Sequence, residues 1–107
     1  MRNEYDPRTR SITLRPDASL YAYFHELAHK EQHDTGAIAF ELWCRLKRLR
    51  VLGHLLLLWV ELDALRRARR ALRRMGCWTD EAKSEAYRGF MSYIRQEEPD
   101  TGAQLCH

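Results

Sequence analysis

The spacing of apolar residues predicts a largely helical chain. Apolar side chains recur at intervals of three and four positions, which places them on one face of an α-helix. The pattern predicts four helices, at about 18–33, 37–50, 54–75 and 80–96. Gly36 and Gly76 are expected to end the first and third helices, and Thr79 to cap the fourth. Gly53 is expected to break or bend the chain before the third helix.

One short segment has the pattern of a strand instead. Residues 11–15 alternate between polar and apolar side chains and include β-branched residues, as an edge strand with one wet face does. Residues 1–10 are polar and irregular, and we expect them and residues 98–107 to be flexible. The expected fold is therefore a mainly α (α+β) single domain over residues 1–107, with about four helices and one short edge strand.

Composition and cysteine usage narrow the class of protein. The chain has 107 residues, of which 45% are hydrophobic and 31% charged, as in a globular domain. Its three cysteines form no Cys-x-x-Cys pair, and an odd number at wide spacing argues against a disulfide framework. The first residues lack the apolar run of a signal peptide. The longest apolar run, 51–60, is about half of what spans a bilayer. We expect a cytoplasmic protein without a membrane span.

Residues 25–29 read His-Glu-Leu-Ala-His and lie inside the first predicted helix. Positions four apart lie one helical turn along the axis and only about 40° around it, so the imidazoles of His25 and His29 can point to a common centre. Glu26 then stands beside that centre, within reach of a water that a metal ion activates. The segment is therefore a candidate for two ligands and the general base of a zinc hydrolase.

A catalytic zinc ion usually takes three protein ligands and keeps a position for water. Four residues that follow the motif are candidates for the third ligand: His33, Asp34, His54 and Glu61. His33 lies two turns from His25, about 12 Å along the axis, so three rings cannot converge unless the helix breaks. Asp34 is set aside for a similar reason.

Glu61 is the stronger candidate because of its surroundings. Its neighbours at three, four and seven positions are apolar or histidine, so it is the one carboxylate on an otherwise apolar stripe. A buried, unpaired carboxylate is costly, so a cation is expected opposite it. Asp63 points about 200° away and is expected to form a solvated ion pair beside Arg66 and Arg67. His54 shares the stripe and stays open as an alternative ligand, a substrate contact or a half-buried structural histidine.

Two stretches resemble the small gluzincin metallopeptidases, such as the minigluzincins and the ImmA/IrrE-like peptidases. One is Phe-His-Glu-Leu-Ala-His at 24–29 after a short strand, and the other is Glu61-Leu-Asp-Ala64-x-x-x-Ala68 on a later helix. The resemblance covers roughly residues 11–75 and implies a zincin-like core with Glu61 as the third zinc ligand. Leu65 departs from the pattern, because those families often place Asp or Asn there as the partner of one histidine. Residues 11–15 would have to be the edge strand that holds an extended peptide.

The expected function is a zinc-dependent metallopeptidase with one Zn²⁺ per chain, acting on a protein or peptide substrate. Zinc held by His25, His29 and Glu61 would lower the pKa of its bound water to near 7. Glu26 would take a proton as this water attacks the peptide carbonyl, and return it to the leaving amine. Three residues stay open as the group that stabilises the oxyanion: His54, Tyr87 and Tyr93.

The third predicted helix also carries six arginines on its outer faces: Arg66, Arg67, Arg69, Arg70, Arg73 and Arg74. A solvated face that suits the negative end of the helix dipole explains them without any partner. The alternative is an anionic partner, which would make the chain a non-enzymatic nucleic-acid or protein binding module. A further alternative is an SprT-like protease acting on DNA-associated proteins, with His54 as the third ligand. The apolar run at 51–60 can be buried within one chain or in an oligomer.

Overall fold

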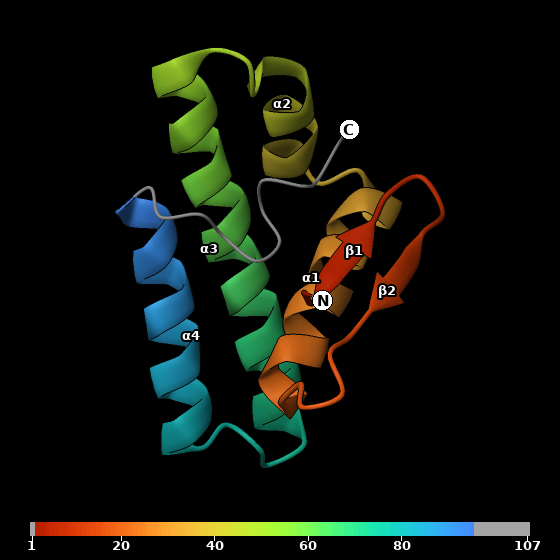
Figure 1. Ribbon diagram of the computed structural model, residues 1–107, viewed down its shortest axis with the longest axis vertical. Helices are drawn as coiled ribbons and strands as arrows, with labels where there is room; N and C mark the ends of the chain where they lie inside the picture. The colour runs from red at the N-terminus through yellow and green to blue at the C-terminus, as the bar shows by residue number, and fades with distance from the viewer. Residues whose placement is uncertain (1, 96–107) are drawn as a thin grey trace.

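A computed structural model of the protein describes residues 2–95, which form a two-stranded sheet followed by four helices (Figure 1). The strands are β1 (Glu4–Asp6) and β2 (Ser11–Thr13). The helices are α1 (Leu20–Thr35), α2 (Ile38–Leu46), α3 (Arg50–Arg74) and α4 (Asp80–Ile94). The prediction of a mainly helical chain is confirmed. No helix in residues 2–95 has the length and apolar character needed to cross a membrane.

The sheet is an antiparallel hairpin in which Tyr5 lies opposite Ile12. The expectation that residues 1–10 are irregular is therefore wrong for β1, which pairs with the predicted strand. Tyr5 explains the order of this segment, because its ring is buried and its hydroxyl forms a 2.8 Å hydrogen bond with His33 Nδ1 on α1. The expected flexible end at 98–107, which includes Cys106, lies outside the described residues.

Caps define both ends of α1 and the start of α4. Ser19 accepts a hydrogen bond from the Ala22 N–H at the start of α1, and Gly36 ends this helix with a left-handed φ of 65°. Thr79 accepts one from the Ala82 N–H at the start of α4. These limits agree closely with those predicted from the capping residues.

The junction between α2 and α3 differs from the prediction. The second helix ends at Leu46 rather than near residue 50, and α3 begins at Arg50, so Gly53 lies inside its first turn. Gly53 therefore does not break the helix. A Cβ atom there would lie 2.5 Å from the backbone oxygen of Lys47, so a hydrogen at this position lets α3 start against the end of α2.

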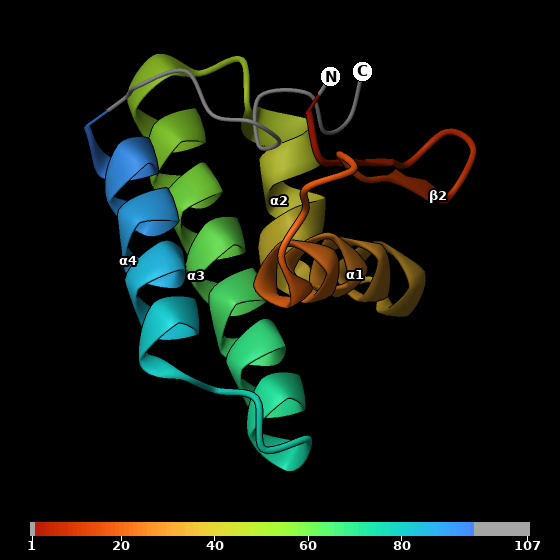
Figure 2. The same ribbon diagram turned by 60° about the horizontal axis from the view of Figure 1, so that its bottom comes forward.

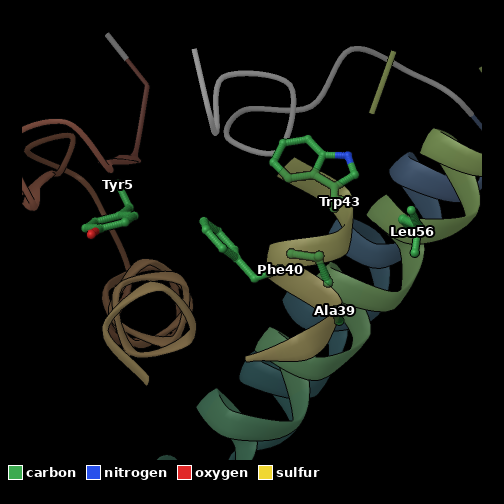
Figure 3. Close-up of a cluster of buried hydrophobic side chains, with 6 residues drawn as sticks. Tyr5, Ala39, Phe40, Trp43 and Leu56 are labelled. Atoms are coloured by element: carbon green, nitrogen blue, oxygen red, sulfur yellow. The ribbon is translucent and has the colours of Figure 1, made fainter. Parts of the chain in front are cut away.

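The long helix α3 connects two hydrophobic clusters. The first lies between the hairpin, α2 and the N-terminal half of α3 (Figure 3), and comprises Tyr5, Ala39, Phe40, Trp43, Leu56 and Val60. The second lies where α1 begins beside α3 and α4, and comprises Tyr21, Ala68, Leu72, Ala82 and Ala86. In Figure 2, α1 crosses α3, whereas α4 runs alongside it. The region between the clusters is where the polar residues of α1 meet α3.

Two glycine substitutions should have opposite effects on stability. Gly53→Ala should lower the free energy of unfolding by about 1–3 kcal/mol, because the new methyl group collides with the Lys47 backbone. Gly89→Ala, in α4, should raise it by about 0.5–1 kcal/mol, because a Cβ there meets no atom within 4 Å and alanine favours helix. Urea denaturation monitored by circular dichroism measures both. Equal effects of the two variants would contradict the close approach at Gly53.

Candidate metal centre

The buried face of α1 carries the polar residues of the centre. Glu26, His29 and Gln32 have at most 1% of their surface exposed, and the His25 side chain has 15%. Positions 25, 29 and 32 follow the spacing of one helical face, so a single helix delivers these side chains to the same side. Burial of four polar side chains on one helix requires partners for each of them.

The middle of α3 supplies the third candidate ligand. Glu61 is 2% exposed and lies between buried Val60 and Ala64. Its Oε1 lies 3.0 Å from His25 Nε2 and 3.0 Å from His29 Nε2. One ligand atom from each of the three residues lies within 4.8 Å of the others. The structure thus brings together the three residues that the sequence analysis selected as ligands.

Gln32 fixes which nitrogen of His29 carries a hydrogen. The amide nitrogen of Gln32 lies 2.9 Å from both the Val60 carbonyl oxygen and Asp63 Oδ2, which can only accept. The amide oxygen of Gln32 must therefore face His29 Nδ1, at 2.9 Å, and accept a hydrogen bond from it. This leaves His29 Nε2 as the nitrogen that faces Glu61.

This arrangement demands positive charge at the centre. In neutral His29 the Nε2 atom has a lone pair, which would point at the carboxylate oxygen of Glu61. Two electron-rich atoms 3.0 Å apart repel each other unless a proton or a metal cation lies between them. Histidine nitrogens and a carboxylate oxygen are a donor set that zinc prefers. The three residues therefore fit a metal cation.

The carboxylates around His25 also favour positive charge, because they stabilise its protonated form. Burial on its own lowers the pKa of His25, but the nearby carboxylates of Glu61 and Glu26 outweigh it and raise the pKa to about 10. Burial disfavours the charged form of Glu61 as well, which on its own raises the pKa of this carboxyl. The adjacent His29 and His25 outweigh burial and bring the pKa of Glu61 below its usual range. The centre therefore favours positive charge, and a metal ion would compete with protons for the same positions.

Two carboxylate oxygens at the centre are buried without a hydrogen-bond partner among the described residues. They are Glu26 Oε1 and Glu61 Oε2. Both residues line a cavity of about 380 Å³ together with His25. Since a buried carboxylate oxygen needs compensation, these atoms are suited to bind a cation, a water molecule or a substrate proton in the cavity.

The structure separates the remaining predicted site residues. Tyr93 is buried and lines the cavity, so it is the only one of the three oxyanion candidates brought to the centre. Tyr87 is 66% exposed on α4 and does not line the cavity, and neither does His54. His33 binds Tyr5 and stacks on Phe40, which agrees with its rejection as a ligand.

The residues that line the cavity differ from those expected for the substrate cleft. Residues 11–15 were expected to form the edge beside the site, but none of them lines the cavity. The opposite wall is α4, through Glu85, Ala86, Phe90 and Tyr93. The sequence analysis connected α4 with the candidate metal centre only through Tyr87 and Tyr93, and it did not predict that α4 forms a wall of the cavity.

Sequence reasoning also missed two contacts of the first turn of α1. Tyr21 stacks on His25 with ring centroids 5.8 Å apart, and Ser19 donates a 2.7 Å hydrogen bond to Glu85 Oε2. Tyr21 lies one turn before His25, so helical spacing could have identified it. The link from Ser19 to Glu85 joins residues 66 positions apart and has no local signal.

Asp63 and Arg67 have a larger role than a solvated ion pair. Arg67 Nε lies 2.8 Å from Asp63 Oδ2, as expected from their spacing. The same oxygen accepts a hydrogen bond from Gln32, and Arg67 also binds Glu31 on α1. Arg67 therefore supports the His29 side of the centre, where Gln32 is the hydrogen-bond partner of His29 Nδ1.

Comparisons with family models, with curated proteins and with solved structures give no match to this chain. The function must therefore be argued from the centre itself.

Replacing Gln32 should weaken metal binding without removing a ligand. Gln32→Met keeps the length of the side chain but leaves His29 Nδ1 without its acceptor, so metal affinity should fall about 10–100-fold. Titration of the metal-free protein with Zn²⁺ by isothermal calorimetry measures this change. Thr35→Ala, on the exposed end of the same helix, is the matched control and should keep the wild-type affinity. Wild-type affinity in Gln32→Met would contradict the role of this residue.

Proposed function

We propose that this protein is a zinc-dependent metallopeptidase of the gluzincin type, with a zincin-like core. One observation carries the proposal. His25 Nε2 and His29 Nε2 both lie 3.0 Å from one oxygen of Glu61, beside a second buried carboxylate, Glu26, that has an unpartnered oxygen. Two histidines, one acidic ligand and an adjacent free carboxylate are the set that metal-assisted hydrolysis requires.

The two distances from the histidines to Glu61 are close to those expected in a zinc site. Tetrahedral zinc with bonds of about 2.0–2.2 Å holds its ligand atoms about 3.3–3.5 Å apart. The two observed contacts of 3.0 Å need to lengthen by only a few tenths of an ångström. A bound zinc ion supplies Lewis acidity and makes a water molecule acidic enough to react near neutral pH.

Glu26 is the residue that moves protons in this proposal. It is 1% exposed, it lines the cavity, and its Oε1 is unpartnered among the described residues. Its Oε2 lies 3.4 Å from His25 Nδ1, which holds the carboxylate beside the candidate ligands. Glu26 takes a proton from the attacking water and passes it to the amine that leaves.

Other residues of the cavity bind and orient the substrate. Tyr93 is buried and lines the cavity, which supports it as the proposed donor of a hydrogen bond to the oxyanion that forms at the scissile carbonyl. Phe90 and Leu65 provide apolar surface beside it. A cavity of about 380 Å³ between helices suits a short segment of a peptide, so we propose protein or peptide substrates.

A second candidate function rests on the exposed arginines of α3. Four arginines of α3 are exposed: Arg66, Arg70, Arg73 and Arg74. They could bind an anionic partner such as nucleic acid, which is the alternative function. Arg67 does not belong to this set because it binds Asp63 and Glu31. The SprT-like alternative has less support, since it needs His54 as a ligand and His54 does not line the cavity.

The ligand set can be tested by metal analysis. The purified protein should contain about one zinc ion per chain, as the three candidate ligands define one site. His25→Ala and Glu61→Ala should each lose most of the metal, and His54→Ala should retain it. Inductively coupled plasma mass spectrometry of the dialysed proteins measures the content. Loss of zinc in His54→Ala with retention in Glu61→Ala would refute the assignment.

The role of Glu26 can be separated from metal binding. Glu26→Gln should keep the zinc content of the wild type and lower peptide hydrolysis at least about 100-fold, because the amide cannot accept a proton. A fluorogenic peptide library measures hydrolysis, and Glu81→Gln on the exposed start of α4 is the control. Equal hydrolysis by Glu26→Gln and the wild type would exclude Glu26 as the general base.

A further inference from the structure

The turn between α2 and α3 and the first turns of α3 expose a group of large apolar side chains. This surface, which we call the α2–α3 tip, contains Leu49, Val51, Leu52, Leu55 and Trp59. Val51 is 76% exposed and Leu55 is 56% exposed. Positions 52, 55 and 59 follow helical spacing, so their side chains share one face of α3. An exposed apolar surface of this kind marks a site of interaction.

The tip is also strongly basic. Residues 42–60 contain four lysines and arginines and no aspartate or glutamate. Arg45, Arg48 and Arg50 are exposed next to the apolar group, and Lys47 lies over the Trp43 ring. The tip therefore combines aliphatic side chains with the positive charge of exposed arginines.

The residues at the start of α3 are not those that stabilise the N-terminus of a helix. The N-cap of α3 is Leu49, which makes no side-chain capping hydrogen bond, and its first turn has no acidic residue. The capping residues Ser19 and Thr79 begin α1 and α4, whereas α2 also begins without a side-chain cap, so the feature particular to α3 is the basic residue Arg50 at its start. Basic residues near a helix N-terminus are unfavourable to the helix dipole. A departure from these local rules at an exposed site points to a use other than folding.

We propose that the α2–α3 tip docks the protein onto a lipid surface that carries anionic headgroups. The aliphatic side chains enter the interface between headgroups and acyl chains, while the arginines bind the phosphates around them. Trp59 has the amphipathic ring that is common at this depth. None of the tip residues lines the cavity, so docking leaves the candidate metal centre accessible.

Other partners fit this surface less well. Nucleic acid matches the arginines but offers no aliphatic surface for Val51 and Leu55. In a two-fold dimer formed through the tip, the same patch meets its own copy, which brings Arg48 and Arg50 towards the like charges of the second chain. An anionic lipid surface satisfies both the apolar and the basic parts.

Vesicle flotation with the full chain tests the proposal. The wild type should float with vesicles of phosphatidylserine and phosphatidylcholine and not with vesicles of phosphatidylcholine alone. The double variant Val51→Ser/Leu55→Ser should bind the anionic vesicles at least about tenfold more weakly, because it removes inserted apolar surface. Tyr87→Ser, which changes an equally exposed residue on α4, is the matched control and should bind as the wild type does.

The role of the charges is tested by the triple variant Arg45→Gln/Arg48→Gln/Arg50→Gln, which should lose the preference for anionic vesicles. Added salt should weaken binding of the wild type to anionic vesicles. Circular dichroism checks that each variant keeps its helices. The proposal is overturned if the wild type floats with neither type of vesicle or equally with both. It is also overturned if Val51→Ser/Leu55→Ser binds like the wild type, or if that variant converts a wild-type dimer into a monomer. None of these results depends on zinc or hydrolysis, so they do not bear on the metallopeptidase proposal.

Discussion

The buried carboxylate of Glu61 is the constraint on which the rest of the structure depends. It lies on α3 between two hydrophobic clusters, with 2% of its surface exposed. A carboxylate in such a place costs several kcal/mol unless a cation or donors compensate it. His25 and His29 provide that compensation, and they do so only if α1 crosses α3 at Glu61. The electrostatic requirement therefore fixes the register of the two helices, while the clusters on either side supply the apolar burial.

A hydrogen-bond network holds the residues that compensate Glu61 in place. Gln32 uses both amide hydrogens on Val60 and Asp63 and its oxygen on His29, so no part of this fully buried side chain is left unpaired. A fully satisfied buried network holds its members in one arrangement, whereas a partly satisfied one is costly. As a result, His29 presents Nε2 to the centre in the orientation that a metal ligand needs. The network ends near the surface at Arg67. This arginine binds Asp63 on α3 and Glu31 on α1, so it joins the two helices beside the candidate ligand His29.

The parts of this structure that the sequence predicted are those with local signals. Helical spacing, with Gly36 at the end of α1 and the cap Thr79 at the start of α4, located these two helices, and the lone carboxylate on an apolar stripe identified Glu61. The strand β1 was missed because Tyr5 lies between Glu4 and Asp6, residue types that are uncommon in strands, and its order comes from the contact of Tyr5 with α1. The stripe of α4 predicted that this helix is buried on one side, but helical periodicity cannot name the neighbour that it is buried against.

The neighbour of each buried helix face, which periodicity does not identify, matters most at the cavity. Tyr5 attaches the hairpin through His33, near the C-terminal end of α1, whereas Tyr21 and His25 border the cavity closer to the start of this helix. The strands therefore leave the wall of the cavity to α4, which is tied to α1 by the hydrogen bond from Ser19 to Glu85. A helix exposes no row of backbone donors and acceptors, so it cannot hold an extended peptide by strand addition. In the proposed metallopeptidase, a substrate in the cavity would consequently contact the side chains of α4 rather than an edge strand.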